Sequence, residues 1–515
     1  MAPTPEESPT PRPGTVYLVG SGPGDPGLIT QRGYFCLQRA DVVLYDYLSN
    51  PEILRFANLV ADEMHCLGSH AERKIWTQDR INAEMVRHAQ AGKTVVRLKS
   101  GDPTVFARAG EEIEALRANN IPFQVVPGIT TALAASAYAG IPLTHSDYAS
   151  AVAFVTGHEK PGKDDSAIDF GALASFPGTL VFYMGVTTAP QWSAALIEHG
   201  KSPDTPCAIV RRCSWPDQET FRCTLGEIPS LLHSGSKIRP PVITVVGEAA
   251  ADRGMPNWFE ERPLFGQSFL VTRPSSQAID LHYPLAEAGA EVLLQPAIEI
   301  NDPHDPQPLE EALQQLKSFD WIVFSSVNGV AYFLSRLRAI GLDYRALGHV
   351  KFGVIGTGTE AALRSFGFRA DVVPEEFRAE SLVDTLANEV SGKRVLLPRA
   401  SRGRDVLPEG LKSHGADVTE VVTYQSDDVV ELSSEVQKRF ATKGIDWVIV
   451  TSSAIAKATV ALLGEELKKS KLVSISPITS NTLRELGFEP VVEAKIYTME
   501  GIVDAILEHV ASTAD

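Results

Sequence analysis

The chain has 515 residues and a formal net charge of −17, with 44% hydrophobic and 22% charged residues. This length is too great for one hydrophobic core and suggests roughly three or four domains, and the acidic balance argues against broad nucleic-acid binding. No apolar run reaches the roughly 20 residues of a membrane span, and no secretory signal opens the chain, so we expect neither a membrane nor a nucleic-acid partner.

The first structured stretch is a short strand, residues 15–19, that enters a glycine-rich loop. Residues 22–27 of this loop spell GxGxxG, and the next strand ends in Asp46. This spacing is compatible with a dinucleotide-binding domain. However, Pro23 and Pro26 remove two backbone N–H donors that a pyrophosphate would use. The loop is better suited to admit a bulky flat ligand beside the backbone.

A second loop with the features of a ligand site follows the apolar run at residues 95–98, which predicts a buried strand. The strand breaks at Ser100-Gly101-Asp102-Pro103, and a helical pattern with acidic first turns resumes near Ala107. Strand, sharp turn and helix are typical of a ligand loop at the carboxyl edge of an α/β sheet. Gly101 lets a ligand approach, and Asp102 can accept hydrogen bonds. A plain strand-to-helix connection explains the same residues equally well.

Two further positions leave a ligand role and a packing role open. The strand at residues 122–126 turns into a small-residue helix, where Thr130 or Thr131 can cap the helix or hold a ligand carboxylate or ribose. Four more strands follow, and Met184 stands where one of them ends. A methionine there packs either on a ligand or, more commonly, in a core.

Six motifs together resemble the tetrapyrrole methylase family, and within it the uroporphyrinogen-III C-methyltransferases. They occur in this order between residues 14 and 248: VYLVGSGPGDPGLIT, DVVLYDYLS, VVRLKSGDPTVFARAGEE, VVPGITTALAASAYAGIPLTH, VTGH and TLVFYMG. The resemblance implies two α/β domains that divide near Thr130, with S-adenosylmethionine (SAM) in the cleft between them. It also implies a homodimer formed through this half.

The resemblance assigns site residues by position. Asp46 matches the family's proposed proton acceptor, which would serve when an electron-rich pyrrole carbon attacks the sulfonium methyl group. The cofactor residues that it implies are Pro23, Ser100, Gly101, Asp102, Val105, Thr130, Thr131, Met184 and Cys213. The chain departs from the family pattern at several of its motif positions. Ser100 and Cys213 stand where the family usually has glycine, Ala107-Arg108-Ala109-Gly110 replaces Gly-Arg-Gly-Gly, and Ser69 replaces a lysine proposed as proton donor, with Lys74 nearby.

The second half is an internal repeat. Arg273 and Arg399 lie 126 residues apart, as do Trp321 and Trp447, and later positions repeat at an offset of 120. Each copy alternates strands and helices, which predicts parallel sheets with helices on both faces. Serine and threonine residues cluster where strands lead into helices. They are good N-caps, but helix N-termini also bind anions and would suit a polycarboxylate.

This half resembles uroporphyrinogen-III synthase from about residue 267 to 510, through the repeat, DWIVFSSVNGV, the Pro-Arg segment and VTEVVTYQS. The family closes the linear tetrapyrrole hydroxymethylbilane with inversion of the last ring, and it needs no metal or cofactor. Tyr424 matches its candidate acid. The expected substrate-binding residues are Ser326, Thr359, Arg399, Ser452 and Thr479.

The expected organisation is α/β throughout: a tetrapyrrole methylase fold of two α/β domains followed by a bilobal synthase fold. The expected segments are a disordered tail (1–13), a methyltransferase (14–248), a linker (249–265) and a synthase (266–515). The synthase would have lobe one at about 266–301 and 432–515, lobe two at about 309–425, and flexible joins at 302–308 and 426–431.

Together the halves predict a bifunctional enzyme that makes uroporphyrinogen III and methylates it twice to precorrin-2, for siroheme or cobalamin synthesis. Five scattered cysteines without a CxxC pair favour reduced thiols in a cytoplasm. One alternative is a methylase of this family with a different substrate, which the changes at Ser69 and Cys213 motivate. The other is a binding protein whose second half senses small anions.

Overall fold

The structure is a computed structural model, and it describes residues 13–57, 64–69, 74–159, 167–403 and 405–513. The chain divides into an N-terminal unit, residues 1–267 with 288–291, and a C-terminal unit, residues 268–287 with 292–515. Most of the expected disordered tail lies outside the described residues. Among the described helices, none is both long and apolar enough to cross a membrane.

The N-terminal unit begins with a parallel five-stranded sheet in the order β3-β2-β6-β1-β7. Its core fills both faces: α2 and α3 cover one face, and α1 covers the other. The strands are β1 (Val16–Gly20), β2 (Val42–Tyr45), β3 (Met64–Cys66), β6 (Val95–Lys99) and β7 (Phe123–Val126), and the helices are α1 (Gln31–Gln38), α2 (Gln78–Gln90) and α3 (Ala109–Ala118).

A second sheet of this unit has the order β11-β10-β12-β9-β8, and only β8 and β9 run parallel among its neighbours. The strand β11 is absent from the sequence expectation because its polar, half-buried residues give no apolar run. The elements are α4 (Thr131–Tyr138), β8 (Val152–Thr156), α5 (Phe170–Ala174), β9 (Thr179–Tyr183), α6 (Ala189–Glu198), β10 (Pro206–Arg211), β11 (Glu219–Thr224), α7 (Ile228–Leu231) and β12 (Val242–Val246).

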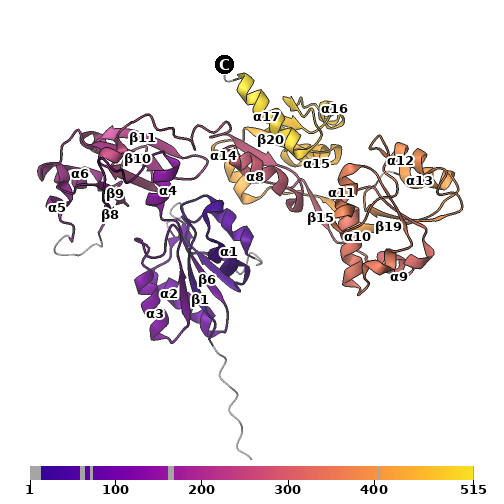
Figure 1. Ribbon diagram of the computed structural model, residues 1–515, viewed down its shortest axis with the longest axis horizontal. Helices are drawn as coiled ribbons and strands as arrows, with labels where there is room; N and C mark the ends of the chain where they lie inside the picture. The colour runs from indigo at the N-terminus through magenta and orange to yellow at the C-terminus, as the bar shows by residue number, and fades with distance from the viewer. Residues whose placement is uncertain (1–12, 58–63, 70–73, 160–166, 404, 514–515) are drawn as a thin grey trace, which may run out of the picture. The chain divides into compact units, whose positions relative to one another are not determined.

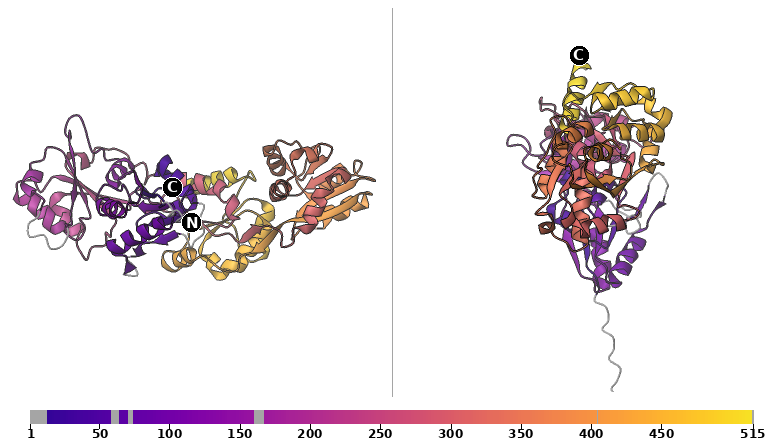
Figure 2. Two further views of the ribbon diagram at one scale, coloured as in Figure 1. Left: turned by 90° about the horizontal axis from the view of Figure 1, so that it is seen from below. Right: turned by 90° about the vertical axis from the view of Figure 1, so that its right-hand side faces the viewer.

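The C-terminal unit has two further sheets, in the orders β14-β13-β20-β21-β22 and β15-β19-β18-β16-β17. Figure 1 and Figure 2 draw this unit in the salmon-to-yellow part of the colour bar. The first sheet contains β13 (Ser268–Val271), β14 (Glu291–Leu294), β20 (Trp447–Val450), β21 (Lys471–Ser474) and β22 (Val492–Glu493). The second contains β15 (Ile298–Asn301), β16 (Trp321–Phe324), β17 (Lys351–Val354), β18 (Arg394–Ala400) and β19 (Asp417–Asp428). The α/β fold class and the repeat of elements are thus confirmed.

The helices of the C-terminal unit follow the same repeat. They are α8 (Ile279–Glu287), α9 (Gln307–Gln314), α10 (Val327–Ala339), α11 (Thr357–Ser365), α12 (Ala379–Leu386), α13 (Val406–Ser413), α14 (Ser434–Thr442), α15 (Ser453–Leu463), α16 (Pro477–Glu485) and α17 (Met499–Thr513). Each sheet combines strands from both copies: β13 of the first copy pairs with β20 of the second, and β18 of the second pairs with β16 of the first.

The connection between the lobes differs from the expected flexible joins. Ile298–Asn301 pairs antiparallel with the end of β19, with Ile298 opposite Asp428 and Asn301 opposite Gln425. Residues 426–428 therefore lie in a strand, and residues 298–301 belong to the sheet of lobe two rather than to lobe one. The short polar stretch after Tyr424 gave no strand signal, because its pairing partner lies more than a hundred residues away in the sequence.

Candidate active sites

Three glycines bring the ligand loops of the N-terminal unit together at the carboxyl edge of the first sheet. A Cβ on Gly128 would lie 2.3 Å from the Gly101 oxygen and 2.7 Å from Gly20 Cα. Gly22 and Gly101 also exchange backbone hydrogen bonds of 3.2 and 2.8 Å. A side chain at Gly20 or Gly128 would separate the loops, so packing requires these two glycines, whereas Gly22 and Gly101 adopt positive φ of 76° and 69°. The loops that follow β1, β6 and β7 therefore form one cradle.

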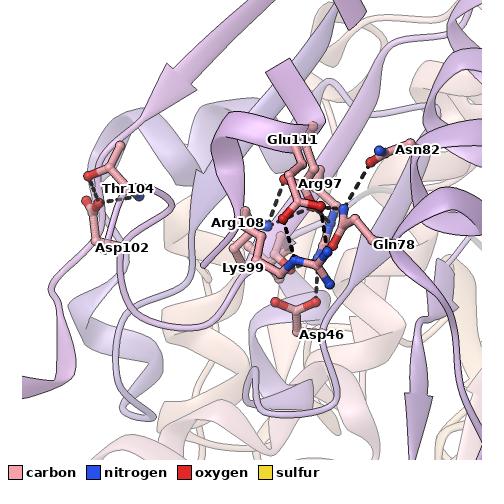
Figure 3. Close-up of polar contacts among 11 residues, drawn as sticks. Asp46, Gln78, Asn82, Arg97, Lys99, Asp102, Thr104, Arg108 and Glu111 are labelled. Atoms are coloured by element: carbon pink, nitrogen blue, oxygen red, sulfur yellow. Dashed lines mark hydrogen bonds and ion pairs between the residues drawn. The ribbon is translucent and has the colours of Figure 1, made fainter. Parts of the chain in front are cut away.

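The Asp102 carboxylate ties this cradle together. One oxygen accepts a hydrogen bond from Gly128 N at 3.0 Å, and the other accepts from Thr104 N at 2.8 Å and Thr104 Oγ1 at 2.6 Å (Figure 3). Two other predicted cofactor residues lie near this loop. Thr131 Oγ1 would be 3.6 Å from a Cβ on Gly101, and Val105 packs against the core of the second sheet. Ser100 is half-buried, and Pro23 is buried in the loop after β1.

Tyr183, at the end of β9, organises the opposite wall and was missed by the sequence analysis. Its hydroxyl lies 2.8 Å from Thr130 Oγ1 and accepts a hydrogen bond from Ala132 N at 3.0 Å. Burial raises the pKa of Tyr183, so the phenol stays protonated. Phe106 packs on this ring with 5.1 Å between centroids. The predicted Thr130 is therefore hydrogen-bonded by Tyr183. The position of Tyr183 directly before the predicted Met184 was the sequence signal that could have identified it.

Met184 is not a core residue. Its side chain is 51% exposed and its backbone has φ of 53°, a left-handed conformation that is uncommon for residues other than glycine. Phe106 shares both properties, with 41% exposure and φ of 53°. Strained backbone and exposed apolar side chains at one edge are typical of a ligand-binding wall.

Cys213 lies between two residues in the left-handed region, Arg212 and Ser214, in the loop after β10. Its side chain is buried, and burial raises the pKa of the thiol, so it is protonated and unreactive. The Ser214 hydroxyl accepts a hydrogen bond from Asp25 N at 3.0 Å, which links this loop to the glycine-rich loop after β1. Cys213 therefore acts as a small apolar side chain beside the cradle.

Asp46, the predicted proton acceptor, belongs to a chain of four alternating charges. Its carboxylate lies 2.5 Å from Arg97 Nη2, and Arg97 Nε donates to Glu112 at 3.0 Å. Lys99 Nζ donates to both oxygens of Glu112 at 2.7 Å. Figure 3 shows Arg97 beside Asp46, with Lys99 and Gln78 around it.

The inner part of this chain is fully buried. Glu112 is 0% exposed, Lys99 1% and Arg97 2%. Burial opposes the charge on Arg97, but Asp46 and Glu112 outweigh it and raise its pKa. Burial and the neighbouring Arg97 lower the pKa of Lys99. Arg97 is thus a permanent cation that holds the Asp46 carboxylate at the end of β2.

The position that lacks the usual lysine can be described only for the backbone. Ser69 and Lys74 pair across the short hairpin β4 (Gly68–Ser69) and β5 (Lys74–Ile75). Their side chains lie outside the described residues.

In the C-terminal unit, Tyr424 lies directly after an irregularity in the pairing of β18 with β19. Arg399 is opposite Val422, whereas Ala400 is opposite Tyr424, so one extra residue turns the tyrosine. The Tyr424 hydroxyl lies 3.1 Å from Ser326 Oγ. Burial raises the pKa of Tyr424, although hydrogen bonds from Ser326 and Asn328 oppose the shift. The phenol therefore retains its proton at neutral pH.

Most of the other predicted substrate residues have their polar groups engaged in helix caps or buried in the protein. Ser326 and Ser452 cap α10 and α15 by accepting hydrogen bonds from Gly329 N and Ile455 N. The side chains of Thr359 and Thr479 are buried in the first turns of α11 and α16. Of the five residues, Ser326 is the one that also contacts Tyr424.

Arg399 is neutralised by carboxylates. It forms ion pairs with Glu420 and with Asp405, the latter at 3.3 Å. Its side chain is 15% exposed, so in this conformation the charge of Arg399 is already balanced within the protein.

Two family models match the chain: Tetrapyrrole (Corrin/Porphyrin) Methylases over residues 15–229, and Uroporphyrinogen-III synthase HemD over residues 280–504. Porphyrin biosynthesis protein HemD of Ruminiclostridium josui is 35% identical over 497 residues, which cover 96% of this chain and 98% of that protein. An S-adenosyl-L-methionine-dependent uroporphyrinogen III methyltransferase of Methanosarcina barkeri is 47% identical over 46% of this chain and 91% of its own length. The crystal structure of uroporphyrin-III C-methyl transferase from Thermus thermophilus, complexed with S-adenyl homocysteine, is similar with TM-score 0.40 and 38% identity, over 46% of this chain and 98% of that one.

Proposed function

We propose that this chain, which belongs to the tetrapyrrole methylase family in its N-terminal half and to the uroporphyrinogen-III synthase family in its C-terminal half, is a bifunctional enzyme of tetrapyrrole biosynthesis. The C-terminal half would cyclise hydroxymethylbilane to uroporphyrinogen III, and the N-terminal half would methylate this product twice with SAM to precorrin-2. The observation that carries the proposal is the match of both halves, in one order, to a porphyrin biosynthesis protein over 98% of its length.

The N-terminal cradle fits SAM. Its loops meet through Gly20, Gly101 and Gly128 without side chains, so a ligand can approach the backbone closely. The exposed Met184 and Phe106 offer apolar surface to a nucleoside and a thioether. When bound, SAM supplies an electrophilic methyl group. Pro23, the Ser100–Asp102 loop, Thr131 and Met184 would hold it, with Thr130 placed by Tyr183.

Asp46 would serve the acid–base part of methyl transfer. A carbon of the reduced pyrrole attacks the methyl group, the C–S bond breaks and its electrons return to sulfur, and the positive charge passes to the pyrrole ring, so a nearby carboxylate stabilises this charge or removes a proton. Arg97 holds this carboxylate at 2.5 Å. Because Glu112 and Lys99 fix Arg97 in turn, the position of Asp46 depends on residues that never reach the cleft.

The synthase half would act by holding the substrate in the reactive conformation and by supplying one proton donor. Hydroxymethylbilane loses its terminal hydroxyl group, the resulting azafulvene is attacked to give a spiro intermediate, and rearrangement inverts the last ring. Tyr424 would donate the proton that leaves with the hydroxyl as water; burial raises its pKa and so keeps the phenol protonated before that step. Ser326, 3.1 Å from the Tyr424 hydroxyl, would orient the phenol.

The decisive experiment is anaerobic incubation of the purified chain with hydroxymethylbilane, with and without SAM, followed by product analysis. We expect uroporphyrinogen III without SAM and precorrin-2 with it. An Asp46→Asn variant separates the halves: it should form the type III isomer normally and lose about 100-fold or more of its methylation rate. Only the type I isomer, which forms without enzyme, would exclude synthase activity. Type III product that stays unmethylated would favour a methylase with another substrate.

A homodimer and a cytoplasmic location complete the proposal. The methylase resemblance supports dimerisation through the N-terminal half, and light scattering of the purified chain tests it. The odd number of scattered cysteines supports a reducing compartment, and fractionation of the producing cells tests that. Both halves in one chain would raise the local concentration of uroporphyrinogen III at the methylase.

A further inference from the structure

Arg273, at the carboxyl end of β13, carries a buried hydrogen-bond donor with no acceptor. Its Nη2 donates to Gln277 Oε1 at 3.1 Å. Its Nη1 is buried and has no hydrogen-bond partner among the described residues. A buried donor that is left unpaired costs about 1–3 kcal/mol, and more when it is charged. Such a group in a folded protein calls for an explanation, and a ligand that supplies the acceptor is one.

The equivalent position in the second copy of the repeat shows what a structural arginine looks like here. Arg399 is ion-paired with Glu420 and with Asp405. Among the described residues, no carboxylate lies within ion-pairing distance of Arg273. The nearest influence is Asp280, which favours the charged form, while burial lowers the pKa of Arg273. The repeat has thus kept the arginine in both copies and supplied carboxylate partners in one.

Two hydrogen bonds lead from Arg273 toward the helix that begins beside the candidate acid. Gln277, which accepts from Arg273, donates its own amide N–H to Asn328 Oδ1 at 2.6 Å. Asn328 stands in the first turn of α10, and Ser326, which caps that helix, lies 3.1 Å from the Tyr424 hydroxyl. Arg273 and Gln277 follow β13 in the first sheet of the C-terminal unit, whereas Asn328 and Tyr424 belong to elements of the second. The hydrogen bonds therefore cross between the lobes and end on α10, two residues from the serine that contacts the phenol.

We propose that Arg273 binds a carboxylate of the linear tetrapyrrole substrate, and that Gln277 and Asn328 connect this binding site to Tyr424. The inference rests on the proposed synthase function and adds a residue to its site. A guanidinium presents parallel N–H donors that match a carboxylate, and its free edge needs such a partner. With Gln277 holding one nitrogen, the guanidinium has a fixed orientation before the substrate arrives.

The test compares Arg273→Gln, Arg273→Lys and the control Arg338→Gln in the full-length chain. Arg338 is exposed on α10 in the same unit and has no place in the site. Initial rates of uroporphyrinogen III formation give KM for hydroxymethylbilane and kcat. We expect Arg273→Gln to raise KM about 10- to 100-fold, as for the loss of a charged hydrogen bond, with a smaller change in kcat. Arg273→Lys should restore part of the affinity, and Arg338→Gln should match the wild type.

A KM for Arg273→Gln within about twofold of the wild type would overturn the proposal, as would a loss of kcat at unchanged KM. Methylation of added uroporphyrinogen III and thermal unfolding report whether each variant is folded. Should Arg273→Gln fail to fold, Arg273→Lys decides: it retains the charge but not the planar fork, so a wild-type KM would again refute the assignment. A wild-type chain that forms no type III isomer would instead refute the proposed function itself.

Discussion

Replacing Glu112 by glutamine should destabilise the N-terminal unit strongly. The carboxylate of Glu112 accepts two hydrogen bonds of 2.7 Å from Lys99 and one of 3.0 Å from Arg97, and it is 0% exposed. A glutamine keeps the shape but carries no charge and turns an N–H₂ group toward two cations. Lys99 and Arg97 would then remain buried with Asp46 as the one anion that contacts either of them among the described residues.

The expected magnitude follows from burial. Removing one partner of a buried ion pair costs about 3–5 kcal/mol, because the remaining charge stays desolvated. For a unit of this size each kcal/mol lowers Tm by about 2–4 °C, so we expect a decrease on the order of 10 °C. The matched control is Glu111→Gln on the same helix. Glu111 pairs with Arg108 at 2.5 Å, but both side chains are about half exposed, and such pairs contribute about 0–1 kcal/mol.

The deficit of Glu112→Gln should also shrink as the pH rises. Burial lowers the pKa of Lys99 below its ordinary value of 10.5. Between the folded and unfolded pKa values the unfolded chain binds more protons, so stability increases with pH in this window. Without Glu112 the pKa of Lys99 falls further and the window widens downward. Deprotonated Lys99 no longer needs the missing anion.

Scanning calorimetry of the full-length chain at neutral and at alkaline pH measures both effects. Glu112→Gln should lower the transition of the N-terminal unit and leave that of the C-terminal unit in place. The reasoning fails if the variant melts with the Glu111→Gln control at neutral pH, or if its deficit is the same at both pH values.

Three further substitutions test other parts of the two sites. Gly128→Ala should destabilise the N-terminal unit by more than about 3 kcal/mol in urea unfolding, since its Cβ would lie 2.3 Å from the Gly101 oxygen, whereas Gly110→Ala, with open space around it, should not. Tyr183→Phe removes the hydrogen bonds to Thr130 and Ala132 and should raise KM for SAM about 3- to 10-fold with intact folding; an unchanged KM would exclude Tyr183 as a positioning residue. Tyr424→Phe should lower kcat for type III formation about 10- to 100-fold and leave methylation unchanged. Because burial raises the pKa of Tyr424 above its ordinary value of 10, the phenol of the wild type should remain a proton donor up to that pH.

The position of Asp46 was predictable from the sequence, but its partners were not. Arg97 stands in an apolar run that predicts a buried strand, and Glu112 is one of several acids in a first helical turn, where the helix dipole already accounts for them. Their pairing depends on the packing of α3 over β6, which brings together residues 15 positions apart. Local sequence patterns carry no information on such a contact. The sequence hint that Arg97 has a buried anionic partner is the presence of a charged residue within an apolar strand.

The fixed offset of 126 residues predicts the repeat, but it does not predict which copy supplies which functional side chain. The same segment of each copy contributes to the antiparallel pair of β15 and β19. Ile298 in β15 is equivalent to Tyr424 in β19: Ile298 pairs with Asp428, and Tyr424 directly precedes Gln425, which pairs with Asn301. One copy has an apolar side chain at this position and the other has the candidate acid. For the equivalent arginines the first copy has the candidate binding group: the guanidinium of Arg273 has no ion pair among the described residues, whereas that of Arg399 in the second copy is paired with carboxylates. A duplicated scaffold thus holds two chemically different groups, one from each copy, and the hydrogen bonds through Gln277 lead from the first toward the helix that Ser326 caps beside the second.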